Sequence, residues 1–189
     1  MNKKRFISLF IIFVLLVVGW ICIDKKVILK LFHPRFYKEY VETYSKEFDI
    51  DENLVYSVIK VESKFNKKAV SRRNAKGLMQ ISDITQTWAE DELGLKDTDI
   101  FDPETNIKIG CWYLSKLYKE FNDLDLVITA YNGGSGNVNK WLKNTDYSHD
   151  GSKLHEIPFN ETKNYLKKVK ENYLVYKELY REEESNEKN

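Results

Sequence analysis

Beyond the N-terminal segment, apolar residues recur along the chain every three or four positions, which is the spacing of an α-helix with one buried face. The clearest row is Leu54, Val58, Val61 and Phe65. Asp51 precedes this row and can cap the helix. Glu62 belongs to the neighbouring row, so we expect its carboxylate beside the apolar stripe and not opposite to it.

Further helices are predicted on the same grounds. Asp102-Pro103 is a cap followed by proline at the first helical position, and Gly133-Gly134 is a stop signal. The expected helices cover about residues 34–48, 51–65, 82–93, 103–121, 124–131 and 138–142, with a last helix that carries the row from Leu166 to Tyr180. Ser82 or Asp83 can cap the third of them. Because no alternating strand pattern or repeat occurs, the sequence predicts one all-α domain over residues 35–181.

The N-terminus is a separate element. Residues 2–5 are polar and basic, and residues 6–23 are apolar apart from a serine and a glycine, which is close to the roughly 20 apolar residues of a membrane span. No small-x-small cleavage site follows. We therefore expect residues 1–26 to form a cytoplasmic basic stub and a single-pass transmembrane signal anchor in the cell membrane. Residues 27–34 are then a short linker, and residues 182–189 a polar tail.

Composition narrows the possible partners. The chain has 30 basic and 29 acidic residues, so its charge does not predict nucleic-acid binding. The 12 Tyr, 10 Phe and 4 Trp can be core, but aromatic rings also serve as platforms in sugar-binding clefts. Cys22 lies in the apolar segment and Cys111 in a helical stripe, so a disulfide between them is not expected.

Carboxylate side chains are the remaining candidates for catalysis once other catalytic motifs are excluded. The three histidines lack the spacing of metal ligands, and the phosphate-loop, dinucleotide and G-x-S-x-G fingerprints are missing from the sequence. We therefore expect neither a metal nor an organic cofactor. A carboxyl group such as Glu62, with amide, hydroxyl and aromatic support, is the best candidate for catalysis.

Five sequence blocks resemble the soluble lytic transglycosylase (SLT) domain, in the order that the family has them. The blocks are Glu62-Ser63-x-Phe65-Asn66, Gly77-Leu78-Met79-Gln80-Ile81, Asp102-Pro103-x-x-Asn106-Ile107, Ala130-Tyr131-Asn132 and Ile157-Pro158-Phe159-x-Glu161-Thr162-x-x-Tyr165. They cover most of residues 50–170. Three departures concern the shape of the cleft: Ser82-Asp83 where proline is usual, Gly133-Gly134-Ser135-Gly136, and Lys163 where arginine is common.

The resemblance implies a lysozyme-like fold and cleavage of the β-1,4 bond between N-acetylmuramic acid and N-acetylglucosamine in the glycan strands of peptidoglycan. It gives Glu62 the role of catalytic acid and base. The substrate-binding residues that it implies are Ser63, Ser71, Met79, Gln80, Tyr131, Asn132, Glu161 and Tyr165. Five of them have an ordinary structural alternative: Ser71 as a turn cap, Met79 as core, Asn132 as a helix end, and Glu161 and Tyr165 as residues of the last helix.

Members of this family resemble substrate-assisted glycosidases, in which one carboxyl group serves where most glycosidases use two. Apolar surroundings would raise the pKa of Glu62 and keep it protonated near neutral pH. The C6 hydroxyl of the muramic acid then attacks, which gives a 1,6-anhydro product. Two alternatives stay open. A lysozyme-type muramidase would use water, activated by a carboxylate such as Asp83 or Glu161, and a non-catalytic peptidoglycan-binding component of a cell-envelope machine would not cleave the strand.

Overall fold

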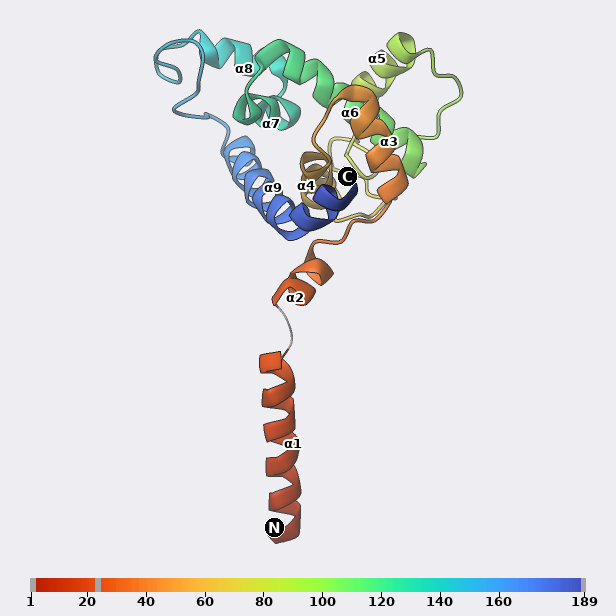
Figure 1. Cartoon of the computed structure of the whole chain (residues 1–189). Coiled ribbons are helices and arrows are strands. Elements are labelled where there is room, and N and C mark those ends of the chain that lie inside the picture. The colour runs from red at the N-terminus through yellow and green to blue at the C-terminus, as the bar shows by residue number, and fades with distance from the viewer. Residues whose placement is uncertain (1–2, 23–24, 188–189) are drawn as a thin grey trace. The chain divides into compact units, whose positions relative to one another are not determined.

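The computed structural model describes residues 3–22 and 25–187, and its regular elements are helices (Figure 1). They are α1 (Lys3–Cys22), α2 (Lys25–Phe32), α3 (Lys38–Phe48), α4 (Glu52–Glu62), α5 (Asp83–Leu93), α6 (Pro103–Phe121), α7 (Leu124–Gly133), α8 (Ser135–Leu142) and α9 (Asn160–Glu187). Within the described ranges, extended backbone pairs only in isolated bridges, Val70 with Lys76 and Lys76 with Ile81. The all-α prediction is confirmed for this part of the chain.

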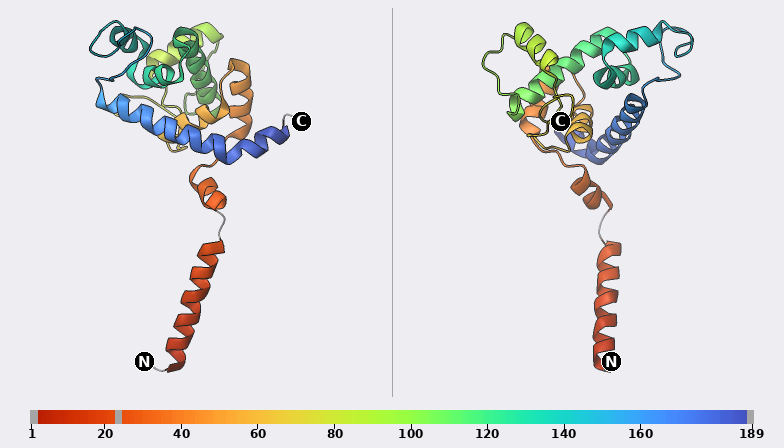
Figure 2. Two further views of the ribbon diagram at one scale, coloured as in Figure 1. Left: turned by 60° about the vertical axis from the view of Figure 1, so that its left-hand side comes forward. Right: turned by 180° about the vertical axis from the view of Figure 1, so that it is seen from behind.

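The chain divides into two compact units, one formed by residues 1–34 with 179–189 and the other by residues 35–178. In the second unit α6 is the central helix and packs against α3, α5 and α7. The part of α9 that belongs to this unit lies beside α4 (Figure 2). The fully buried rings of Tyr56 on α4 and Tyr176 on α9 stack with centroids 5.6 Å apart. The core of this unit therefore joins helices that are far apart in sequence.

The helix ends follow local sequence signals. Asp51 accepts a hydrogen bond from the Asn53 amide at the start of α4, and Asp102 accepts one from the Thr105 amide at the start of α6. Of the two cap candidates for α5, Ser82 is the cap, because its hydroxyl accepts from the Thr85 amide. These contacts satisfy amide groups that have no partner inside the helix. The predicted starts of the three helices are confirmed.

The prediction of a transmembrane helix at the N-terminus has a different outcome. None of the helices in residues 3–22 and 25–187 is long and apolar enough to cross a membrane. The expected transmembrane helix, and with it the single-pass anchor, is therefore not supported. Residues 1–2 and 23–24 of the expected anchor segment and residues 188–189 of the expected tail lie outside the described residues.

Two further segments differ from expectation. The expected linker at residues 27–34 is largely helical, because α2 continues to Phe32. The last helix does not end at Glu182 but continues to Glu187, which agrees with the high helix propensity of glutamate. Within the first unit, the Tyr180 hydroxyl donates a hydrogen bond to the carbonyl of His33 at 2.8 Å.

Candidate active site

Glu62 is the last residue of α4, at the point where the chain leaves the helix. Residues 53–59 of this helix are all buried, so α4 is a core helix. Ser63 is the C-cap, and Lys64 and Phe65 then adopt left-handed backbone conformations with φ of 51° and 65°. The sharp turn that follows leaves Glu62 half-buried at the end of a core helix.

The surroundings of Glu62 disfavour its charged form. Burial raises the pKa of Glu62 from 4.5 to about 7, an interaction with the Tyr165 hydroxyl acts in the opposite direction, and the negative charge of Glu161 raises the pKa further. A carboxyl group with such a pKa is present in both protonation states at neutral pH. It can therefore donate a proton and take one back in the same reaction.

Tyr165 reaches Glu62 from α9, more than a hundred positions along the chain. Its ring is buried, and among the described residues its hydroxyl makes no hydrogen bond of standard distance and angle. The hydroxyl nevertheless lies close enough to Glu62 to hold the pKa of that carboxyl below the value that burial alone would give. Burial first, and the nearby Glu62 charge second, raise the pKa of Tyr165 well above its usual value. Tyr165 thus stays a neutral donor.

Tyr131 lies on α7, and its hydroxyl is held by the loop between α4 and α5. Its hydroxyl donates a hydrogen bond to the carbonyl of Met79 at 2.9 Å. Burial, and then the charge of Glu62, raise the pKa of Tyr131 well above its usual value. The structure therefore brings Glu62, Tyr131, Tyr165 and Glu161 into one electrostatically coupled group, although they come from three helices.

The segment between α4 and α5 is a structured loop that holds two of the predicted substrate-binding residues. The hydroxyl of Ser71 accepts hydrogen bonds from the amides of Arg73 and Ala75, so this side chain does cap a turn. Gln80 has a left-handed backbone with φ of 52°, and its Nε2 donates to the carbonyls of Ala69 and Gly77. Both side chains therefore stabilise the loop itself.

Asn106 fixes this loop to α6. Its Oδ1 accepts from the Met79 amide at 2.7 Å, and its Nδ2 donates to the carbonyls of Lys76 and Ile100 at 3.0 and 2.9 Å. Gly77 lies against this side chain, since a Cβ atom there would come within 2.2 Å of Asn106 Nδ2. The sequence pointed to Asn106 only as part of a motif, and its function as the loop's anchor was missed. A fully buried asparagine on a helix would have been the signal.

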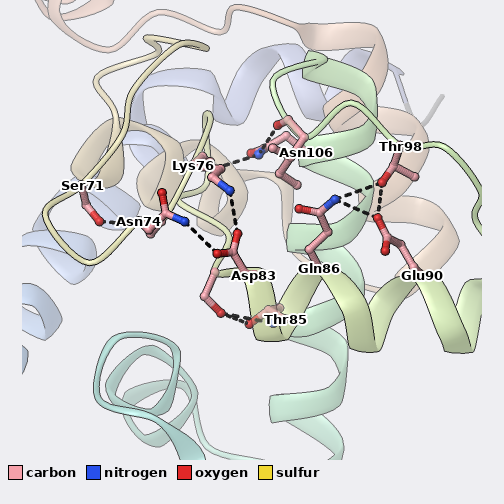
Figure 3. A network of polar contacts seen from close by, with 12 residues as sticks. Ser71, Asn74, Lys76, Asp83, Thr85, Gln86, Glu90, Thr98 and Asn106 are labelled. Atoms are coloured by element: carbon pink, nitrogen blue, oxygen red, sulfur yellow. Dashed lines mark hydrogen bonds and ion pairs between the residues drawn. The ribbon is translucent and has the colours of Figure 1, made fainter.

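A second polar network ties the loop to the start of α5 (Figure 3). Asp83 accepts hydrogen bonds from Lys76 Nζ at 2.6 Å and from Asn74 Nδ2 at 2.7 Å. These two contacts hold the pKa of Asp83 below its usual value. The residues that replace the family's usual proline therefore build a contact of their own, with Ser82 as the helix cap and Asp83 as the loop anchor.

The remaining predicted substrate-binding residues differ in their exposure. Met79 is fully buried, and its side chain lies against Gly110, where a Cβ atom would meet the sulfur. Ser63 is also buried and donates to the carbonyl of Ile59. Asn132 accepts a hydrogen bond from the Thr162 hydroxyl at 2.8 Å, so α7 and the start of α9 are joined beside Tyr131.

Glu161 is exposed at the start of α9 and faces the loop. Its carboxylate lies 3.6 Å from the Arg73 guanidinium, and both side chains are largely in solvent. Such a pair contributes little to stability, because water screens both charges. No group of three or more candidate metal ligands occurs in the part of the chain that the structure describes. The chemistry that the site offers is proton transfer by Glu62, with the Tyr165 hydroxyl as the neighbouring donor and the Tyr131 hydroxyl bonded to the Met79 carbonyl.

The chain is similar to proteins of one known family. The family model of the transglycosylase SLT domain matches residues 39–153. A soluble lytic murein transglycosylase of Salmonella typhimurium is 35% identical over 154 residues, which cover 78% of this chain and 23% of that protein. A membrane-bound lytic murein transglycosylase C of Photorhabdus laumondii is 39% identical over 110 residues, which cover 50% of this chain and 30% of that protein.

The fold is also similar to a solved structure. An inactive glutamate-to-glutamine mutant of the lytic transglycosylase Slt from Pseudomonas aeruginosa superimposes with a TM-score of 0.69 at 26% identity. The match covers 79% of this chain and 25% of that one. The chain therefore spans about a quarter of the length of these relatives, and the residues that the family model matches include Glu62.

Proposed function

Because the chain belongs to the transglycosylase SLT domain family, we propose that it is a lytic transglycosylase that cleaves the β-1,4 bond between N-acetylmuramic acid and N-acetylglucosamine in peptidoglycan. The reaction leaves 1,6-anhydro ends, and Glu62 acts first as the acid and then as the base. Since peptidoglycan lies outside the cytoplasmic membrane, this activity requires the helical domain to be extracytoplasmic.

The observation that carries the proposal is the environment of Glu62. Burial raises the pKa of this carboxyl to about 7, the Tyr165 hydroxyl interacts with it, and its charge in turn raises the pKa of Tyr131. A glycosidic oxygen is a weak base, so its protonation near neutral pH needs an acid of this kind. A protein that only binds peptidoglycan has no use for a carboxyl group with a raised pKa. The inactive glutamate-to-glutamine mutant of the Pseudomonas relative is consistent with a glutamate as the essential group in that protein.

The proposed reaction needs one proton donor and no second carboxylate. Glu62 donates its proton to the bridging oxygen, and the bond from that oxygen to C1 of the muramic acid breaks. The substrate's N-acetyl group stabilises the oxocarbenium-like centre. The C6 hydroxyl then forms a bond to C1 and returns its proton to Glu62, which restores the starting state. Water does not enter the products.

The sugar is proposed to lie among the side chains that surround Glu62. Tyr165 and Tyr131 are the groups best placed to orient the carboxyl, and Asn132 holds α7 against the start of α9 through Thr162. The proposed substrate-binding residues are Ser63, Ser71, Met79, Gln80, Tyr131, Asn132, Glu161 and Tyr165. For Met79 and Ser63 the contribution is through the backbone and packing, since both side chains are buried.

Two carboxylates were candidates for activating water in a lysozyme-type hydrolysis. Asp83 is held by Lys76 and Asn74, and those contacts lower its pKa, so it is a poor base. Glu161 is exposed, and its carboxylate lies 3.6 Å from the Arg73 guanidinium. Both contacts favour the transglycosylase over the muramidase. Of these two carboxylates, Glu161 fits the hydrolytic alternative better, because its charge contributes to the raised pKa of Glu62.

The proposal is tested by digestion of purified peptidoglycan with the protein, followed by mass spectrometry of the released muropeptides. Anhydro ends support transglycosylation. Reducing ends would assign the protein to the hydrolases, and a digest without products would leave it a binding protein. The Glu62→Gln variant is the matched control, because it keeps the shape of the side chain and removes the acid.

A further inference from the structure

A row of aromatic rings leads from the site to the surface of α5. Tyr131 packs against Tyr113 of α6 with ring centroids 5.4 Å apart, and Tyr113 packs against Trp88 of α5 at 6.3 Å. The row begins next to the acid, since the charge of Glu62 contributes to the raised pKa of Tyr131. It ends at Trp88, of which 42% is exposed. The three helices that carry these rings lie side by side, with α6 between α5 and α7 (Figure 1).

Trp88 is held firmly for an exposed side chain. Its Nε1 donates a hydrogen bond to Glu92 at 2.9 Å, and its ring packs edge-on against the buried Trp112 with centroids 4.8 Å apart. The ammonium group of Lys116 lies 5.7 Å from the centre of the Trp88 ring and also pairs with Glu92. An indole in such a frame keeps one orientation without a ligand, so a ligand that stacks on it does not have to order it first.

A fixed, partly exposed indole is suited to one class of ligand in particular. A pyranose presents a flat face of C–H groups, and an aromatic ring offers an apolar face of matching shape, with a negative quadrupole that attracts those C–H groups. The neighbouring Trp112 is buried, with 3% exposed, whereas Trp88 keeps part of its ring open to solvent. The position of Trp88 at the end of a row that starts beside Glu62 argues for a sugar of the same strand that the acid attacks.

We propose that Trp88, supported by Tyr113, forms a distal sugar subsite that stacks on a pyranose ring of the glycan strand beyond the two sugars whose bond is cleaved. This inference rests on the proposed function for the identity of the strand. It makes Trp88 a specificity-determining residue that favours long strands over short fragments. Lys116 and Glu92 are positioning residues, because they touch the indole and not the sugar.

The subsite is tested by calorimetric titration of the Glu62→Gln protein with oligomers of N-acetylglucosamine, which bind without being cleaved. Trp88→Ala in this background is expected to weaken binding of the hexasaccharide about tenfold and to leave binding of the disaccharide unchanged. Trp88→Phe keeps an aromatic ring and is expected to retain most of the affinity. Leu174→Ala removes an exposed apolar side chain of α9 and serves as the matched control.

Equal losses for the two oligomers, or no loss for the hexasaccharide, would overturn the subsite. Thermal unfolding of each variant shows whether a loss comes from misfolding, and the Trp88→Phe variant keeps the test decisive if Trp88→Ala does not fold. The outcome is independent of the cleavage test. A parent protein that releases no products, together with hexasaccharide binding that depends on Trp88, would reject the enzymatic function and retain the sugar site.

Discussion

The side-chain oxygen of Asn106 accepts a hydrogen bond from the Met79 amide at 2.7 Å, although 27 positions separate the two residues. The carbonyl of the same Met79 accepts from the Tyr131 hydroxyl, so one loop residue is held from α6 and itself holds a ring of α7. Tyr131 in turn lies beside Glu62. The geometry around the acid therefore depends on a side chain that does not belong to the catalytic group.

Replacement of Asn106 by alanine tests this dependence. The change leaves the Met79 amide and the carbonyls of Lys76 and Ile100 without their side-chain partner in a buried place. We expect the free energy of unfolding to fall by about 3 kcal/mol, because each unsatisfied buried group costs about 1–3 kcal/mol. Urea denaturation measures the loss. Asn172→Ala, which removes an exposed hydrogen bond to the Lys168 carbonyl, is expected to change stability by less than about 0.5 kcal/mol. Equal effects of the two changes would contradict the anchoring role.

The features of the fold and the site that the sequence predicts are those that depend on residues close together in the chain. Local signals were sufficient for the helix starts, because a cap such as Asp51 or Asp102 acts on an amide two or three residues away. The helical period also put Glu62 beside the buried stripe. The anchoring by Asn106 and the pairing of Asp83 with Lys76 depend on which segments meet in space, and a single sequence does not contain that information.

The N-terminal predictions differ from the structure. An apolar run of about the right length predicts a span, but no described helix is long and apolar enough to cross a membrane. The linker prediction rested on position alone. Strong helix formers such as Lys25 and Leu29 favour a helix wherever nothing breaks it.

Glu62→Gln is expected to stabilise the protein at alkaline pH. The pKa of Glu62 is 4.5 in its ordinary setting and about 7 in the folded protein, so the folded state binds the proton more tightly than the unfolded chain. The wild type therefore loses stability as the pH rises from about 4.5 through about 7, and the loss reaches about 2–3 kcal/mol. Glutamine cannot ionise. Unfolding curves of the wild type and the variant are expected to coincide at pH 4 and to separate at pH 8. Equal stability of the two proteins at both pH values would refute the raised pKa of Glu62.

Tyr165→Phe is expected to raise the pKa of Glu62 further. The substitution keeps the buried ring and removes the hydroxyl whose interaction lowers the pKa of that carboxyl. The decline of kcat/KM on the alkaline side should therefore move to higher pH, since Glu62 must be protonated to act as the acid. A pH–rate profile measures the shift. Tyr173 lies on the same helix as Tyr165, and its hydroxyl donates to Asp51 at the start of α4. Tyr173→Phe is the control and should leave the profile unchanged.

Neither Asp83→Asn nor Glu161→Gln is expected to abolish cleavage. Asp83 is occupied by Lys76 and Asn74, and the proposed reaction needs no second carboxylate, so Glu161 is not required for it either. We expect kcat to change less than about tenfold for both variants, whereas Glu62→Gln should lose it entirely. The initial rate of peptidoglycan solubilisation is the measurement. Loss of activity in the Glu161 variant as complete as in the Glu62 variant would favour a two-carboxylate hydrolase.

The central claim is that Glu62 alone passes the proton in both steps and that the sugar's own hydroxyl completes the reaction. Digestion of peptidoglycan in water enriched in oxygen-18, with the wild type and with Glu62→Gln, tests it most directly. The wild type is expected to release muropeptides with anhydro ends that carry no label, and the variant is expected to release none. Labelled reducing ends from the wild type, or products from the variant, would contradict the account.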